Sequence, residues 1–271
     1  MDGPPHFPFT PAIVAALSGL AVCVLYPLAL RFATPMNGIL AASTVDFSNP
    51  ALWAVIIGWV MSVTLHELAH GIIGYWGGDY TIRERGGLTL NPLQYVNPLN
   101  SIVLPIVFLM LGGIPLPGGA TYIRHDLLRN KHWESGVSAA GPAMNLILFG
   151  LLAIPLLPSV GWINPNIDPI EWSVAQKFVA AMCFLMLLAA ILNLVPVPTL
   201  DGFGIISPYL SRDLQEKLNQ PQVRSWCYFG YFLLLWKVPA FMGAIIEAMF
   251  HIMGPTLFIR SYDGFRVALY G

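Results

Sequence analysis

Charged side chains are scarce in this sequence. Asp, Glu, Lys and Arg make up 10% of its 271 residues, whereas 56% are hydrophobic and the mean hydropathy is +0.67. Soluble domains carry about a quarter charged residues. The few polar stretches are all shorter than the ~50 residues that an independent soluble domain needs. The composition therefore excludes a soluble globular protein and predicts a polytopic membrane protein.

Other features are missing as well. A formal net charge of -1 provides no basic face, so we expect no nucleic-acid partner. The three cysteines, Cys23, Cys183 and Cys227, lie in separate apolar stretches without a CxxC pair, which is typical of small buried residues. The first residues, 1–9, lack the basic start of a signal peptide, so the first apolar run is expected to be a retained span.

Apolar runs of about the ~20 residues that a bilayer requires cover 9–31, 51–76, 136–157, 172–196 and 225–252. The segment 101–116 is shorter and contains proline and glycine, so it either crosses or re-enters. The longer run 225–259 contains Lys237 and Pro239 and predicts one kinked helix or a tight pair. We expect one membrane-embedded domain over 1–271, with a core at about 51–205 flanked by helices 9–31 and 225–252.

The most informative motif lies inside the second apolar run, where residues 66–70 read His66-Glu67-Leu68-Ala69-His70. Positions i and i+4 share one face of a helix, so the two histidines can hold one zinc ion while Glu67 serves as a general base. Ionisable side chains are costly at membrane depth, and three of them together indicate a functional site.

A catalytic zinc site usually has three protein ligands and leaves a fourth position for water. Asp201, at the end of the run 172–196, is the preferred third ligand, although Asp201-Gly202 could also form a simple turn. His70 lies toward the C-terminal end of its span and Asp201 at the end of another, so they meet at one depth only if those spans run parallel. The run 136–157 supplies the single crossing this needs, so 101–116 is predicted to be re-entrant. The alternative third ligands are His6, His125, His132 and His251.

Basic residues agree with this topology. If 101–116 does not cross, most of the loop Lys and Arg residues share the side of the proposed active site, and the positive-inside rule places that end and the N-terminus in the cytoplasm. That side would hold Arg83, Arg85, Arg124, Arg129, Lys131, Arg212, Lys217 and Arg224, and the other Arg31, Arg260 and Arg266.

These motifs resemble the site-2 protease family of intramembrane zinc metalloproteases, peptidase family M50. The resemblance rests on the histidine motif, on Asn193-Leu194-Val195-Pro196-Val197-Pro198-Thr199-Leu200-Asp201-Gly202, on Gly141-Pro142-Ala143-Met144-Asn145 and on Gly87-Leu88-Thr89-Leu90-Asn91-Pro92. It implies one Zn²⁺ per chain held by His66, His70 and Asp201, with Glu67 as the base and Asn193 stabilising the oxyanion. It also implies a small member, without the PDZ or CBS domains of larger ones, in a prokaryotic plasma membrane.

Two further segments are candidate substrate contacts. Residues 79–91 have a hairpin-like pattern, and a membrane-associated β-hairpin could offer the edge formed by Leu88, Thr89 and Leu90 to an unwound substrate. A plain surface loop is the alternative. Asn145 follows a run of small residues suited to close helix packing, so it either bridges two helices or contacts substrate.

The fold expected is an all-α bundle of about five to six transmembrane helices, with a short re-entrant segment and the hairpin. The function expected is intramembrane cleavage, near the cytoplasmic face, of a transmembrane helix of another membrane protein, with the lipid bilayer as the other partner. A zinc-binding scaffold without protease activity is the alternative. A transporter is disfavoured because the chain has no internal repeat of the kind many transporters show.

Overall fold

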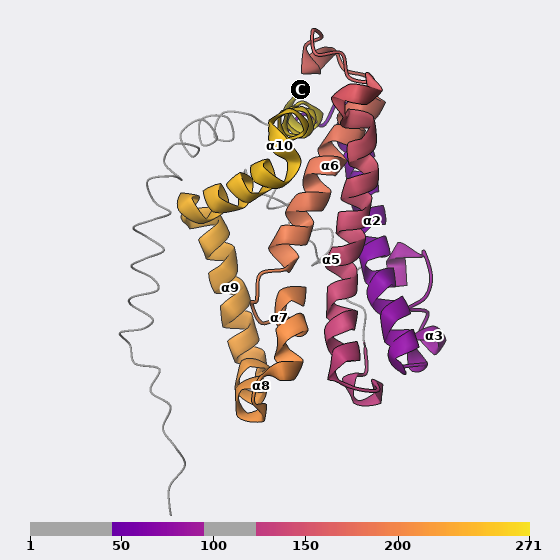
Figure 1. Ribbon diagram of the computed structural model, residues 1–271, viewed down its shortest axis with the longest axis vertical. Helices are drawn as coiled ribbons and strands as arrows, with labels where there is room; N and C mark the ends of the chain where they lie inside the picture. Colours follow the sequence, from indigo (N-terminus) through magenta and orange to yellow (C-terminus); the bar gives the residue numbers. More distant parts are fainter. Residues whose placement is uncertain (1–44, 95–122) are drawn as a thin grey trace, which may run out of the picture.

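The computed structural model describes residues 45–94 and 123–271 (Figure 1). All regular structure in these two ranges is helical. The helices are α2 (Pro50–Gly77), α3 (Thr81–Glu84), α5 (Lys131–Ala153), α6 (Val174–Asn193), α7 (Asp201–Ile206), α8 (Arg212–Leu218), α9 (Pro221–Lys237) and α10 (Pro239–Tyr270). Short 3-10 turns lie at Pro92–Gln94, His125–Leu127, Ile154–Leu156, Pro158–Val160, Pro169–Glu171 and Ser207–Tyr209.

Four of the described helices are long and apolar enough to cross a membrane: Pro50–Gly77, Lys131–Leu156, Val174–Asn193 and Pro239–Tyr270. The first three match the runs 51–76, 136–157 and 172–196 that the sequence predicts. The expected span 9–31 and the doubtful segment 101–116 lie outside the described residues.

Polar caps fix where the long helices begin. The side chain of Asn49 accepts a hydrogen bond from Ala51 N at the start of α2, and Asn130 caps α5 through His132 N. Ser173 and Gln176 form a capping box at the start of α6. Such caps satisfy backbone N–H groups that have no partner within the helix, so each apolar helix begins at a defined residue.

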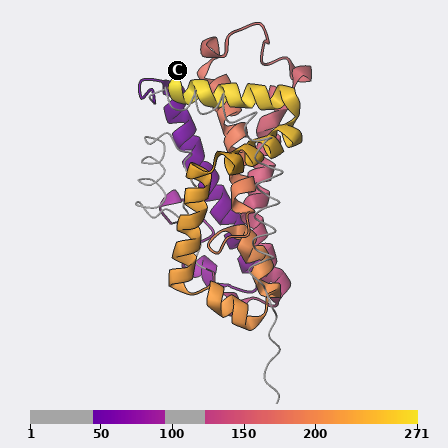
Figure 2. The same ribbon diagram turned by 90° about the vertical axis from the view of Figure 1, so that its left-hand side faces the viewer.

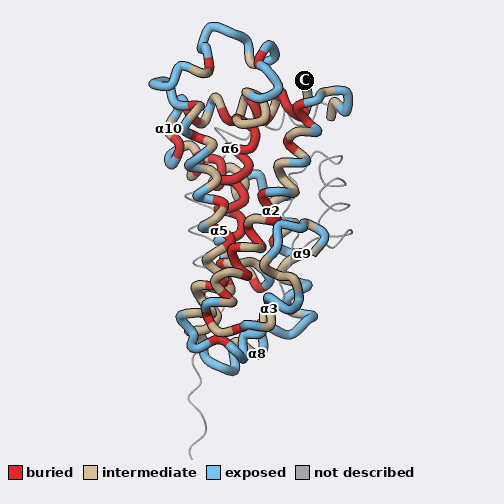
Figure 3. The backbone as a smooth tube through the Cα atoms, turned by 90° about the vertical axis from the view of Figure 1, so that its right-hand side faces the viewer, coloured by how far each residue is buried: buried red, intermediate tan, exposed pale blue. Residues whose placement is uncertain are grey.

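Helix α6 is the centre of the bundle. Every residue from Ala180 to Ala190 is buried, because α2, α5 and α10 pack around this helix (Figure 3). A helix that is apolar on all sides is stable only inside a core or a membrane. The buried residues of α6 therefore form the spine against which the other spans are placed.

Hydrogen bonds at the helix ends establish the direction of each span. Arg129 N, just before α5, donates to Gly77 O at the end of α2 (3.0 Å), so α5 starts where α2 stops. At the opposite end Gln176 of α6 donates to Trp162 O, which follows α5. Helix α5 therefore runs antiparallel to both neighbours, and α2 and α6 run parallel.

The structure contradicts the β-hairpin predicted over 79–91. Thr81–Glu84 form a helical turn, and Leu88, Thr89 and Leu90 lie in turns and bends. The cause is Asp79, whose fully buried carboxylate accepts hydrogen bonds from Thr81 N (3.2 Å) and from Arg124 N (2.8 Å). An aspartate in this position closes a local turn in place of a strand.

The C-terminal run 225–252 is two helices and not one span. Helix α9 stops at Lys237, and α10 begins at Pro239 after Val238 adopts an extended conformation (φ −114°, ψ 89°) (Figure 2). Proline disfavours the helical conformation in the residue before it, which explains the break. Helix α10 has a second break at Gly254 (φ 70°).

Asp79 gives a test of this local structure. Asp79→Ala leaves the amides of Thr81 and Arg124 without their acceptor, so we expect the free energy of unfolding in detergent to fall by about 2–4 kcal/mol. The exposed carboxylate of Asp126 is the matched control, because Asp126→Ala removes only a surface ion pair and should cost less than about 1 kcal/mol. An equal loss of unfolding free energy in both variants would contradict the role of Asp79 as the acceptor that closes this turn.

Candidate metal centre

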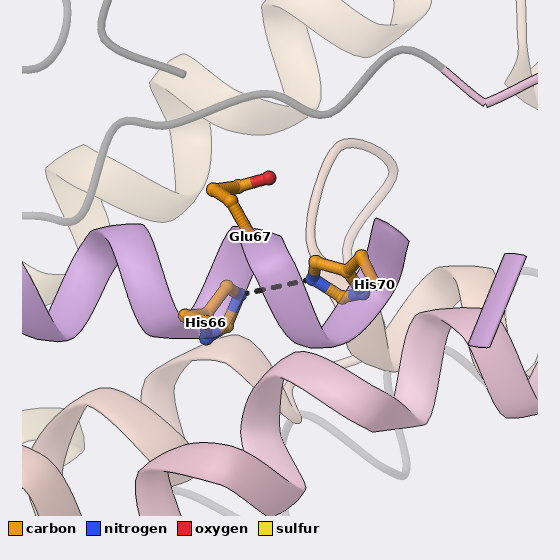
Figure 4. A group of neighbouring side chains, drawn as sticks. All are labelled: His66, Glu67 and His70. Carbon is orange, nitrogen blue, oxygen red and sulfur yellow. Dashed lines mark hydrogen bonds between the residues drawn. The ribbon is translucent and has the colours of Figure 1, made fainter. Parts of the chain in front are cut away.

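His66 and His70 lie one turn apart on α2, and each is 7% exposed. Their Nε2 atoms are 3.1 Å apart, and Figure 4 shows the two side chains on one side of the helix, joined through these atoms. The i, i+4 spacing therefore brings the two nitrogens together as the sequence predicts. Both belong to a buried group of side chains, with Glu67, whose ligand atoms lie within 4.8 Å of one another.

A backbone carbonyl orients His70. Val137 O on α5 lies 2.6 Å from His70 Nδ1. A carbonyl can only accept, so His70 carries its proton on Nδ1 and Nε2 keeps its lone pair. Histidines that bind metals commonly have their second ring nitrogen held in this way.

Asp201 is the first residue of α7, and its carboxylate faces both rings. Oδ2 is 3.1 Å from His66 Nε2, and Oδ1 is 3.4 Å from His70 Nε2. Burial raises the pKa of Asp201, but the facing imidazole rings of His66 and His70 outweigh burial and lower the pKa to about 2. The carboxylate is therefore ionised at neutral pH, which is the form that binds a metal.

The donor set fits zinc. With metal–ligand bonds of about 2.0–2.1 Å, two ligands of a tetrahedral ion lie about 3.3 Å apart. The separations here are 3.1 Å between the nitrogens, and 3.1 and 3.4 Å from each nitrogen to its nearer carboxylate oxygen. His66, His70 and Asp201 can thus hold one tetrahedral zinc ion and leave the fourth position open.

Gly141 makes room for this group. A Cβ atom at Gly141 on α5 would overlap the Nε2 atoms of both His66 and His70. The absence of a side chain allows the α5 backbone to approach the imidazole pair, and it brings the Val137 carbonyl within reach of His70. The glycine of the sequence motif Gly141-Pro142 thus has a steric function at the metal centre.

Glu67 lies between the two histidines in sequence, and Figure 4 shows its side chain leaving α2 on a neighbouring face. It is 6% exposed and belongs to the same buried group as His66 and His70. Its carboxylate is therefore close to the metal-binding nitrogens without lying on their face of the helix. This placement is compatible with a base that acts beside the ion.

The two candidate asparagines are buried on neighbouring helices, Asn145 on α5 and Asn193 at the end of α6. Neither side chain forms a hydrogen bond with any residue of 45–94 or 123–271. The expectation that Asn145 bridges two helices therefore has no hydrogen-bonded partner among these residues.

Leu88, Thr89 and Leu90 form no strand edge, but their turn lies near the histidines. Gly71 follows His70, and a Cβ at Gly71 would overlap Gly87 O and touch the Leu88 side chain. Leu90 is exposed. The alternative third ligands His125 and His132 are both exposed, and His132 instead pairs with the Tyr209 hydroxyl (2.8 Å).

Two contributions to the centre were not predicted from the sequence. The Val137 carbonyl has no sequence signal, because any residue could provide a backbone oxygen. The requirement for Gly141 had a signal, since it lies among small residues, but the sequence connected that run with helix packing and not with the histidines.

Gly141→Ala tests the steric requirement. The added methyl group would displace both imidazoles, so we expect zinc affinity to fall about 10- to 100-fold, as when groups that orient metal ligands are lost. The control is Gly150→Ala on the same helix, where an added Cβ meets nothing within 4 Å. Zinc titration of both detergent-purified variants measures the effect, and wild-type affinity in Gly141→Ala would contradict it.

Several known proteins are similar in sequence to this chain over most of its length. "Putative zinc metalloprotease Rip2" of Mycolicibacterium smegmatis is 37% identical over 207 residues, which cover 74% of this chain and 76% of that protein. The protein of the same name from Mycobacterium tuberculosis H37Rv is 37% identical over 243 residues, 88% of this chain and 87% of its own. "Putative zinc metalloprotease YwhC" of Bacillus subtilis is 29% identical over 196 residues, 68% of this chain and 80% of its own.

No family model and no solved structure matches the chain. The identity to Rip2 exceeds 30% across more than two thirds of both proteins. In this chain the histidine motif and the Asp201 segment converge on one buried centre. The chain therefore belongs to the site-2 protease family of zinc metalloproteases.

Proposed function

We propose that this chain is an intramembrane zinc endopeptidase that cleaves a transmembrane segment of another membrane protein. The observation that carries the proposal is the convergence of His66, His70 and Asp201 within a bundle of apolar helices. Relatives named as zinc metalloproteases support protease activity. A scaffold would need the metal ligands but would have no use for Glu67.

Each residue has a definite role in this proposal. His66, His70 and Asp201 would hold one zinc ion, which would act as a Lewis acid and lower the pKa of a bound water. Glu67 accepts the proton of the attacking water and returns it to the leaving amine. Asn193 donates a hydrogen bond to the scissile carbonyl oxygen as negative charge develops there.

The substrate has to unwind before it is cleaved. The amides of a transmembrane helix are occupied by internal hydrogen bonds, so the scissile carbonyl is accessible only where that helix is broken. Helix-breaking residues near the depth of the site therefore favour cleavage. The turn at Leu88 and the buried Asn145 amide are candidate contacts for the unwound segment.

The end of the bundle that holds the site is assigned to the cytoplasm. Arg83, Arg129 and Lys131 lie at that end, where α2 stops and α5 starts, whereas Arg260 lies at the opposite end and donates to Leu156 O (2.6 Å). This distribution supports the positive-inside orientation. The relatives are bacterial, which supports a prokaryotic plasma membrane as the location.

Glu67→Gln tests the function. The amide cannot accept the proton of water, so we expect cleavage of a single-span model peptide in lipid vesicles to fall by about 10²–10⁴-fold with zinc content unchanged. Glu84→Gln, an exposed position on α3, is the matched control and should keep the wild-type rate. Cleavage is followed by mass spectrometry of the peptide fragments.

Two results would contradict the proposal. A wild-type rate in Glu67→Gln would remove Glu67 as the base. A zinc-loaded wild-type chain that cleaves neither membrane-inserted nor soluble peptides would favour the zinc-binding scaffold.

A further inference from the structure

A cavity of about 440 Å³ with polar and apolar walls adjoins the candidate metal centre. It lies at the end of the bundle among the start of α5, α7, α8 and the start of α9, in the lower part of Figure 1. Asp201 forms part of its wall, so the cavity reaches the carboxylate that faces the histidine pair. Helices α5 and α7 contact each other beside the cavity, where the Ser135 hydroxyl donates a hydrogen bond to Ile205 O (2.8 Å).

The polar part of the cavity wall disfavours a wholly apolar occupant. Glu134, Ser138, Gln215 and Arg224 line the cavity, beside apolar groups of Leu200, Phe203 and Pro208. A leucine or valine from the centre of a transmembrane segment would take these groups out of water without pairing them, which is costly. The natural occupant is therefore the polar flank that follows the apolar part of a substrate helix.

Glu134 is the charged group best placed to bind a side chain of that flank. It is half-buried, whereas Arg224 and His125 at the same cavity are exposed. No residue of the described ranges forms an ion pair with Glu134. An unpaired, half-buried carboxylate on the wall of a cavity favours a cationic ligand, because a charge-assisted hydrogen bond offsets its partial loss of hydration.

The position of Glu134 on α5 also fixes its distance from the histidine pair. Glu134, Ser138 and Gly141 are spaced i, i+4 and i+7 and share one face of α5, and Gly141 touches the metal-binding histidines. Seven residues of helix span about 10 Å, which is the length of about three residues of extended chain. A substrate residue at Glu134 is therefore about three residues from the bond at the metal.

From this geometry we propose that the cavity is a substrate subsite in which Glu134 selects a Lys or Arg about three residues from the cleaved bond. The inference rests on the proposed function and adds a specificity to it. Charge complementarity supports it, since membrane proteins concentrate Lys and Arg beside the cytoplasmic ends of their spans. The site end of this bundle is the end assigned to the cytoplasm.

The backbone conformation of Thr199 is a second indication that the cavity has a function. Thr199 lines it, directly before Leu200 and Asp201, and has a φ of 106°. A β-branched residue is strained in this conformation, and such strain persists mainly where a site requires the geometry.

The experiment uses single-span peptides in phosphatidylcholine vesicles. Each peptide has a Leu/Ala segment with a central Gly, and a flank in which one Lys, Gln or Glu is placed at successive positions. Binding is measured with the full chain carrying Glu67→Gln, so that the peptide is not consumed, and cleavage is measured with the zinc-loaded wild type. Glu134→Gln and Glu134→Lys are compared in both backgrounds, and Glu216→Gln on α8, exposed and outside the cavity, controls for net charge at this end.

We expect the Lys peptide to bind about tenfold more tightly than the Glu peptide, the preference to disappear in Glu134→Gln and to invert in Glu134→Lys. Glu216→Gln should keep the preference. If the wild type cleaves the peptides but binding does not depend on the charge of the flank, the subsite is overturned and the proposed protease activity stands. If the charge preference inverts in Glu134→Lys but the zinc-loaded wild type cleaves no peptide, the proposed function is refuted and the cavity remains a binding site for a charged flank. No binding of any peptide would overturn the subsite.

Discussion

The site depends on two apolar helices that run in the same direction, so that the chain leaving one lies beside the C-terminal half of the other. Helix α2 contributes His66 and His70, and the chain that leaves α6 contributes Asp201 within 3.1–3.4 Å of both. Parallel neighbours require a crossing between them, which α5 supplies. Because α5 approaches through Gly141 and offers the Val137 carbonyl to His70, the connecting helix is also part of the centre. A cation bound by these groups would compensate the cost of burying them together.

The end of α6 shows how an apolar helix can deliver a carboxylate. Pro196 and Pro198 cannot continue the helical hydrogen bonds, so α6 stops at Asn193 and Asp201 starts a new helix after an irregular segment. Irregular backbone at membrane depth is tolerated where protein surrounds it or where it lines a polar cavity. Both conditions hold here, since Gly202 packs on Leu194 O and Thr199 lines the cavity beside Asp201. The same break therefore places Asp201 beside the two histidines and contributes to the wall of the adjoining cavity.

The sequence predicted those features that a local pattern or a strong physical constraint determines. The spans 51–76, 136–157 and 172–196 follow from the length of apolar runs, and the pairing of His66 with His70 follows from helical spacing. The hairpin over 79–91 was wrong because one buried aspartate, Asp79, provides a turn with an acceptor that the alternating pattern did not reveal. The Val137 carbonyl, the strained Thr199 and the cavity at Glu134 depend on how distant segments meet, and no single stretch of sequence encodes them.

The central claim is that Asp201 completes a three-ligand zinc site with His66 and His70. The most direct test is the metal content of the detergent-purified chain, measured for the wild type and for Asp201→Ala side by side, with Asp213→Ala on the exposed helix α8 as control. The account predicts about one zinc per chain in the wild type and the control, and a loss of most of it in Asp201→Ala. Full zinc occupancy in Asp201→Ala would contradict the account.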